Sequence, residues 1–206
     1  MKNFKHLCMI SSAASLLGGC VSLLPDAPKP SDKLTLESSM IPEQGAHKKS
    51  DSVLAVAPPH SSDYRDTTRV VVFHEKSGAL VQDYMIGTEW SDRLPLAFQS
   101  ALIQSLESQQ LFKGVIYQSE AIDSELILMT DIRRFDVVVN PQGSQELVVE
   151  ITGNLLRSTG RQLMSQRNFS TKEALTEKNL KGLQGAYKLA LTQILKDING
   201  WVREKV

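Results

Sequence analysis

The chain has 206 residues, with 23 basic and 23 acidic side chains and two cysteines. This length favours one domain of ordinary size. The balanced charge provides no general attraction to nucleic acid or to anionic lipid, so composition alone predicts no nucleic-acid partner.

The N-terminal segment has the pattern of an export signal. A positive flank of two lysines precedes a weakly apolar core at residues 9–17, and two glycines then place small residues directly before Cys20. The apolar core is shorter than the roughly 18 to 20 residues needed to cross a bilayer. The sequence therefore favours a cleaved signal over an uncleaved transmembrane helix.

The stretch from Leu17 to Cys20 resembles a bacterial lipobox, in which the cysteine is acylated and becomes the first residue of the mature protein. The resemblance implies removal of residues 1–19 and a lipid anchor on Cys20, with the more than one acyl chain that stable anchoring requires. Val21 follows where an aspartate would tend to retain the protein in the inner membrane, which favours the periplasmic face of the outer membrane. The alternative is an ordinary secretory signal with an incidental cysteine. Since Cys8 would leave with the signal, neither a disulfide nor a catalytic thiolate is expected.

Residues 20–50 contain four prolines among serines and charged residues. Such a stretch has too few apolar groups to offset its ordering entropy, so it predicts a flexible or polyproline-like tether. The folded body is expected from residue 51 to residue 206 as a single domain, because neither an internal repeat nor a second linker is found.

The first predicted strands are short and rich in β-branched residues. Val53–Ala57 is ended by two prolines, and Arg69–Phe73 is a second apolar run. Leu80–Tyr84 follows Gly78 closely, which predicts that it forms a hairpin with the second run.

An amphipathic helix is expected next. Ser91 is the candidate N-cap, with Asp92 in the first turn and Pro95 close behind. Apolar residues then recur at spacings of three and four, which predicts a helix that ends near Gln110 with one stripe on a sheet. A short strand is expected at residues 115–117.

The C-terminal half predicts three long strands and a closing helix. Residues 125–139, for much of their length, and residues 147–155 alternate between apolar and polar side chains. Residues 162–169 return after a second glycine-containing turn, which predicts an antiparallel meander of three strands. Residues 180–202 carry one apolar stripe that includes Trp201. The predicted fold class is α+β: two layers, with a mainly antiparallel sheet and two amphipathic helices packed on one face.

The sequence shows no catalytic constellation. None of the four histidines is paired with another ligand at helical spacing, and no serine has the base and the glycine-flanked elbow of a nucleophile. The expectation is therefore no enzyme, no metal and no cofactor.

Two features remain as candidates for contact with a partner. Asp131, Arg133, Arg134 and Asp136 form the densest charge cluster, expected as ion pairs on a solvated sheet face, with a subunit interface as the alternative. The aromatic residues Tyr84 and Trp90 bracket Gly87 near a helix start. Burial in a packed corner is favoured for them, and an exposed contact is the alternative.

The order and spacing of segments over about residues 51–206 is similar to the auxiliary lipoprotein family of ABC-type transport systems. The segments that carry the resemblance are Asp63–Val70, Asp83 and Tyr84, the turn at Trp90, Leu111–Val115, Glu125–Leu128, Arg133–Phe135, and the closing pair Trp201 and Val202.

The resemblance implies a periplasmic lipoprotein that docks with an inner-membrane ABC transporter and with a substrate-binding protein of the mammalian-cell-entry (MCE) type in lipid transport. The protein would act by docking and assembly with its partners, and a homo-oligomer is one possible assembly. The candidate interface residues are Tyr84, Trp90, Arg133 and Arg134. Two alternatives come from other classes: a structural or assembly lipoprotein of an envelope secretion machine, and a small envelope hydrolase. Direct lipid binding in a groove between sheet and helices is a further hypothesis.

Overall fold

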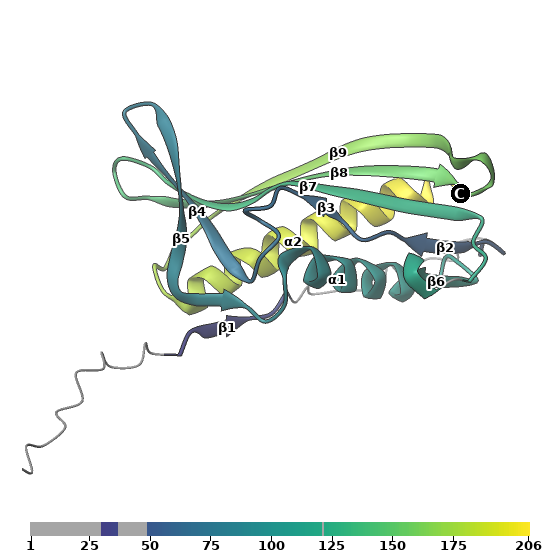
Figure 1. The fold of residues 1–206 in the computed structure, drawn as a ribbon, viewed down its shortest axis with the longest axis horizontal. Coiled ribbons are helices and arrows are strands. Elements are labelled where there is room, and N and C mark those ends of the chain that lie inside the picture. Colours follow the sequence, from purple (N-terminus) through teal and green to yellow (C-terminus); the bar gives the residue numbers. More distant parts are fainter. Residues whose placement is uncertain (1–29, 37–48, 121) are drawn as a thin grey trace, which may run out of the picture.

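The computed structural model describes residues 30–36, 49–120 and 122–206. It confirms the predicted α+β architecture, because one sheet forms a layer and two helices lie together on one of its faces (Figure 1). In chain order the elements are β1 (Asp32–Leu34), β2 (Val53–Val56), β3 (His60–Ser61), β4 (Arg69–Lys76), β5 (Ala79–Trp90), α1 (Leu94–Ser108), β6 (Gly114–Tyr117), η1 (Gln118–Glu120), β7 (Leu126–Val139), β8 (Gln145–Arg157), η2 (Thr159–Arg161), β9 (Gln162–Ala174) and α2 (Leu180–Arg203).

The long strand β7 is the centre of the sheet. On one side it pairs with β8, which pairs with β9, so the predicted antiparallel meander is confirmed. On its other side β7 pairs in parallel with β2, β3 and β4, which lie one after another along its length. The sheet is therefore mixed, and these parallel pairings are an addition to the mainly antiparallel sheet that was predicted. Alternation along a strand gives its buried face but not the identity of its neighbour.

The predicted hairpin is formed by β4 and β5, and β5 extends to Trp90. Its turn contains Ser77 and Gly78 with φ of 51° and 80°, the positive values that a two-residue hairpin turn requires. Further along, the register jumps, because Arg69 lies opposite Glu89 and Val71 lies opposite Tyr84. The extra residues of β5 form a bulge.

The strand β1 lies within the stretch that was predicted to be a tether. It pairs in parallel with the end of β5, and Leu34 is buried in the core with 3% of its surface exposed. The ammonium of Lys33 lies 2.7 Å from the carboxylate of Glu89. A strand of three residues with one buried side chain is too short to show periodicity, so the sequence did not reveal it.

The N-cap residue of α1 differs from the predicted one. Arg93, not Ser91, occupies the N-cap position, and the Ser91 hydroxyl instead donates a hydrogen bond to the Leu34 carbonyl at 3.0 Å. Pro95 lies in the first turn, as predicted. The helix α2 is capped by Asn179, whose side chain accepts a hydrogen bond from the Gly182 amide.

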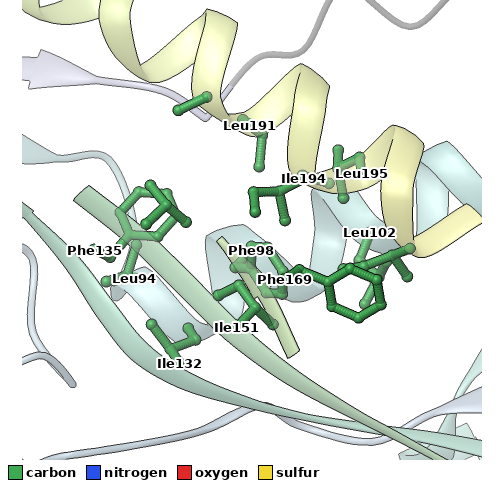
Figure 2. Close-up of a cluster of buried hydrophobic side chains, with 14 of the residues drawn as sticks. Leu94, Phe98, Leu102, Ile132, Phe135, Ile151, Phe169, Leu191, Ile194 and Leu195 are labelled. Atoms are coloured by element: carbon green, nitrogen blue, oxygen red, sulfur yellow. The ribbon is translucent and has the colours of Figure 1, made fainter. Parts of the chain in front are cut away.

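The main core fills the space between the sheet and the two helices. Figure 2 shows Leu191, Ile194 and Leu195 of α2 pointing toward the sheet and α1. Trp201 is 2% exposed, which confirms its predicted place on the buried stripe. The two helices also contact each other, because the Asn199 amide donates a hydrogen bond to the Ser105 hydroxyl at 2.8 Å.

Substitution of Gly153 by alanine is expected to lower the free energy of unfolding by about 1 to 3 kcal/mol. Gly153 lies in β8 against α2, and an added Cβ would lie 3.0 Å from a ring carbon of Trp201 and 3.2 Å from one of Phe169. Urea unfolding followed by circular dichroism measures the change. Gly114→Ala is the matched control, since nothing lies within 4 Å of the corresponding position. Equal stability of the two variants would contradict this account.

Candidate interaction surface

Cys20 lies outside the described residues, so its acylation stays a prediction. The other candidate residues are all described, on β5 and β7.

Trp90 belongs to the core and is not an interface residue. It is 1% exposed, and its ring packs edge-on against Phe135 and Tyr187, with centroids 6.0 and 4.6 Å away. No partner can reach this side chain without unfolding the corner between β5 and α1. The favoured interpretation of Trp90, burial in a packed corner, is therefore confirmed.

Tyr84 is partly exposed and is covered on one face by an arginine. The guanidinium carbon of Arg69 lies 3.5 Å from the centroid of its ring, a cation–π contact across the hairpin. The Tyr84 hydroxyl donates a hydrogen bond to the Tyr64 carbonyl at 3.3 Å. The ring is thus fixed while part of the side chain remains exposed.

A buried ion pair between Arg65 and Asp136 lies next to Tyr64, the residue whose carbonyl binds Tyr84. Arg65 donates to the carboxylate of Asp136 through Nε at 2.8 Å and through Nη2 at 2.7 Å, and the two side chains are 5% and 0% exposed. Burial lowers the pKa of the Arg65 guanidinium, but the hydrogen bond and the charge of Asp136 outweigh burial, so the pKa is raised overall. The Arg65 guanidinium therefore stays charged in the interior, and this bidentate geometry is the strong form of an arginine–carboxylate pair.

The four-residue charge cluster is divided between two environments. A bulge between Ile132 and Arg134 interrupts the register of β7. Arg133 is exposed and pairs with Asp131 at 2.9 Å, as predicted for a solvated face. The prediction is wrong for Asp136, which is buried because the distant Arg65 neutralises it. The Arg134 side chain is intermediate in exposure, and its guanidinium lies 3.5 Å from the carboxylate of Asp136 and 3.8 Å from that of Glu150.

The structure connects Tyr84 and Arg134 through residues that were not predicted as site residues. The Tyr84 hydroxyl donates a hydrogen bond to the Tyr64 carbonyl, and the guanidinium carbon of Arg65 lies 4.4 Å from the centroid of the Tyr64 ring. Arg65 in turn pairs with the carboxylate of Asp136. The Arg134 guanidinium also approaches this carboxylate. In the sequence, Tyr64 and Arg65 belong only to the segment Asp63–Val70 that carries the family resemblance. The sequence contains no local pattern that predicts their contact with β7.

The hairpin of β4 and β5 forms an arm that projects beyond the helix-covered body (Figure 1). It carries three exposed apolar side chains, Leu80, Val81 and Ile86, which are 54%, 43% and 97% exposed. Ile86 lies in the bulge next to Gly87, whose φ is 74°. Within the described part of the chain, the outer edge of β5 is paired only at Thr88–Trp90, by β1. The rest of the arm offers apolar side chains and an unpaired strand edge.

Two features are absent from residues 30–36, 49–120 and 122–206. No group of three or more His, Cys, Asp and Glu side chains there is arranged to hold a metal ion. No helix there is both long enough and apolar enough to span a membrane.

Comparison with known families places the chain. The sequence model of the ABC-type transport auxiliary lipoprotein component family matches residues 34–199. The chain belongs to this family. The match of this transport auxiliary lipoprotein begins inside β1, in agreement with the inclusion of that strand in the folded domain.

Solved structures share the fold of this auxiliary lipoprotein. It is similar to protein XCC0632 from Xanthomonas campestris, with a TM-score of 0.76 and 19% identity over 85% of this chain and 96% of that one. An uncharacterized protein of known structure matches with a TM-score of 0.63 and 15% identity over 84% of this chain and 99% of its own.

A curated relative, the uncharacterized protein bll6063 of Bradyrhizobium diazoefficiens, is 22% identical over 173 residues. These residues are 84% of this chain and 45% of the relative, so the chain spans about half of the relative's length.

Proposed function

We propose that this auxiliary lipoprotein is anchored to the outer membrane through Cys20 and docks with an ABC transporter and an MCE-type protein in lipid transport. Family membership supports a role in a transport system. The lipobox-like stretch before Cys20 supports the anchor. The observation that carries the docking role is the hairpin of β4 and β5, which has the exposed Leu80 and Val81 near its tip and Ile86, 97% exposed, in the bulge at its base.

The arm is suited to docking because it is held at its base. The Arg69 contact and the Tyr64 bond fix Tyr84, and the buried pair of Arg65 and Asp136 joins this corner to β7. An anchored arm that presents apolar side chains loses little conformational entropy when a partner binds. Tyr84, Arg133 and Arg134 remain candidates for the rim of the interface, and a second copy of the chain is one partner that such an arm could contact.

The experiment is a pull-down of the full-length protein from membranes, with a C-terminal tag and mild crosslinking, followed by mass spectrometry. The terminal Val206 is 44% exposed, so a tag leaves the core intact. An MCE protein and an ABC ATPase are expected in the eluate. Recovery of secretion components alone would contradict the transport role and favour an assembly lipoprotein of a secretion machine.

Ile86→Asp is expected to reduce recovery of the partners by about tenfold, because an exposed apolar anchor at the centre of an interface carries much of its affinity. The matched control is Leu163→Asp on β9, a side chain that is 55% exposed and lies away from the arm. Circular dichroism checks that both variants stay folded. Undiminished recovery with Ile86→Asp would exclude the arm as the docking element.

A further inference from the structure

The N-terminal part of α2 has a one-sided charge pattern. From Leu180 to Lys196 the helix carries three exposed lysines, Lys181, Lys188 and Lys196, and no acidic residue. None of these ammonium groups lies within ion-pair distance of any carboxylate that the structure describes. Two leucines border the lysines, Leu180 and Leu189, with 37% and 62% of their surface exposed. We call these five residues the α2 lysine surface.

This surface adjoins the segment that leads toward the N-terminus. A hollow of about 290 Å³ is lined by Lys181, Gln184, Gly185 and Lys188 of α2 and by Thr35, the residue directly after β1. Of the charged groups on β1 and β5 near this hollow, Lys33 and Glu89 pair with each other at 2.7 Å, so Glu89 is already neutralised. The lysines beside Thr35 are therefore left to act on something outside the domain.

The chain length limits how far this surface can be from the membrane. The segment is fixed from Ser31, whose hydroxyl donates to Glu89, through the buried Leu34. Twelve peptide units join Cys20 to Asp32, and at full extension they reach about 40 Å. A flexible chain of that length typically spans about 20 Å. A tether that ran to residue 50 would not impose this closeness.

We propose that the α2 lysine surface binds anionic phospholipid headgroups of the membrane in which Cys20 is anchored. The inference rests on the proposed anchor. Without residues 1–19, which carry two lysines and no acidic residue, the chain has 21 basic and 23 acidic side chains. Attraction to anionic lipid therefore arises only where cations gather locally, and lysines near an anionic surface are attracted within a Debye length. Exposed leucines beside lysines are typical of helices that lie in the interface.

Binding through α2 would orient the domain. The tip of the β4–β5 arm lies on the far side of the molecule from β1 (Figure 1). With α2 and β1 toward the bilayer, the arm points into the periplasm, where a partner that bridges the envelope would meet it. The same chain then uses one surface for the membrane and another for its partner.

The test is lysine footprinting on vesicles. The chain from Cys20 onward contains all described residues and one thiol, which is coupled to a maleimide phospholipid in vesicles of phosphatidylcholine alone or with phosphatidylglycerol. A water-soluble acetylating reagent then modifies exposed lysines, and mass spectrometry gives the rate at each. Lys76 on the arm and Lys172 on β9 serve as internal controls.

On anionic vesicles the acetylation of Lys181 and Lys188 is expected to slow by about fivefold relative to neutral vesicles, and high salt should restore it. Lys196 acts as a reporter in variants: Lys181→Glu/Lys188→Glu should abolish its protection, whereas the equal charge change Lys76→Glu/Lys172→Glu should not. Unchanged rates at Lys181 and Lys188, or equal slowing at Lys76 and Lys172, would overturn the proposal.

Because the thiol of Cys20 is coupled to lipid chemically, the test of lipid binding by α2 does not depend on whether the cell acylates Cys20. The mass of the protein purified from membranes shows whether the cell acylates Cys20. The footprint reports the lipid contact of α2 in either case.

Discussion

Replacement of Asp136 by alanine is expected to lower the free energy of unfolding by about 3 to 5 kcal/mol. Asp136 is fully buried and accepts two hydrogen bonds from Arg65, so its removal leaves a guanidinium that is 5% exposed without its charge partner. Breaking a buried pair on one side costs much more than the pair contributes as a whole. Urea unfolding at neutral pH, followed by circular dichroism, measures the loss.

Two controls separate burial from charge. Asp131→Ala removes the exposed pair with Arg133 and should cost less than about 1 kcal/mol. The double variant Arg65→Met/Asp136→Leu removes both buried charges and should recover much of the stability that Asp136→Ala loses. If the single variant were as stable as Asp131→Ala, Arg65 and Asp136 would not form the pair described.

The same substitution also bears on docking. Asp136 holds Arg65 under Tyr64, and Tyr64 accepts the bond from Tyr84 at the base of the arm. Partner recovery should therefore fall with Asp136→Ala even at temperatures where the variant is folded. Lys172→Ala on β9, which removes an exposed ion pair with Glu146, is the control and should leave this support and partner recovery unchanged.

The longest elements were predicted from a repeating pattern, whereas β2, β4, β5 and β6 were predicted from short apolar runs. Alternation identified β7 and β8, and spacings of three and four identified both helices. Such patterns arise because one face of each element is buried, which depends on local sequence. The parallel pairing of β2, β3 and β4 with β7 depends on distant segments and leaves no local trace.

The candidate site was predicted less well for a related reason. Charged residues on an alternating strand indicate a solvated face, and this holds for Arg133 and Asp131. Asp136 is an exception because Arg65, 71 residues earlier in the chain, reaches it in the interior. The bulge at Arg133 also shifts the alternation, so the faces of Arg134 and Asp136 could not be assigned by counting. Leu34 was missed because a single buried side chain has no period.

Trp90→Ala is expected to cost about 3 to 5 kcal/mol of unfolding free energy, as large-to-small changes of buried aromatic residues do. Trp90 is 1% exposed and contacts the rings of Phe135 and Tyr187, which themselves stack with centroids 5.4 Å apart. Its loss leaves a cavity where β5, β7 and α2 meet, and these elements cannot close it without moving the strand that carries the arm. Burial also raises the pKa of the Tyr187 phenol, and the charge of Asp136 raises it further, so this ring stays neutral in the core.

Tyr84→Ala is the informative comparison for Trp90→Ala, since both residues were candidates for the same interface. Tyr84 contributes one cation–π contact with Arg69 and one hydrogen bond, so its removal should cost about 1 kcal/mol. The two variants should rank differently in the two measurements. Trp90→Ala should be the less stable protein, whereas Tyr84→Ala, compared at equal folded fraction, should recover less of the partners in the pull-down. A Trp90→Ala variant that stayed as stable as the parent but lost its partners would reverse the assignment and place the tryptophan at the interface, against its burial. Because stability and partner recovery are measured independently, the pair of variants distinguishes a residue that builds the arm from one that the arm presents.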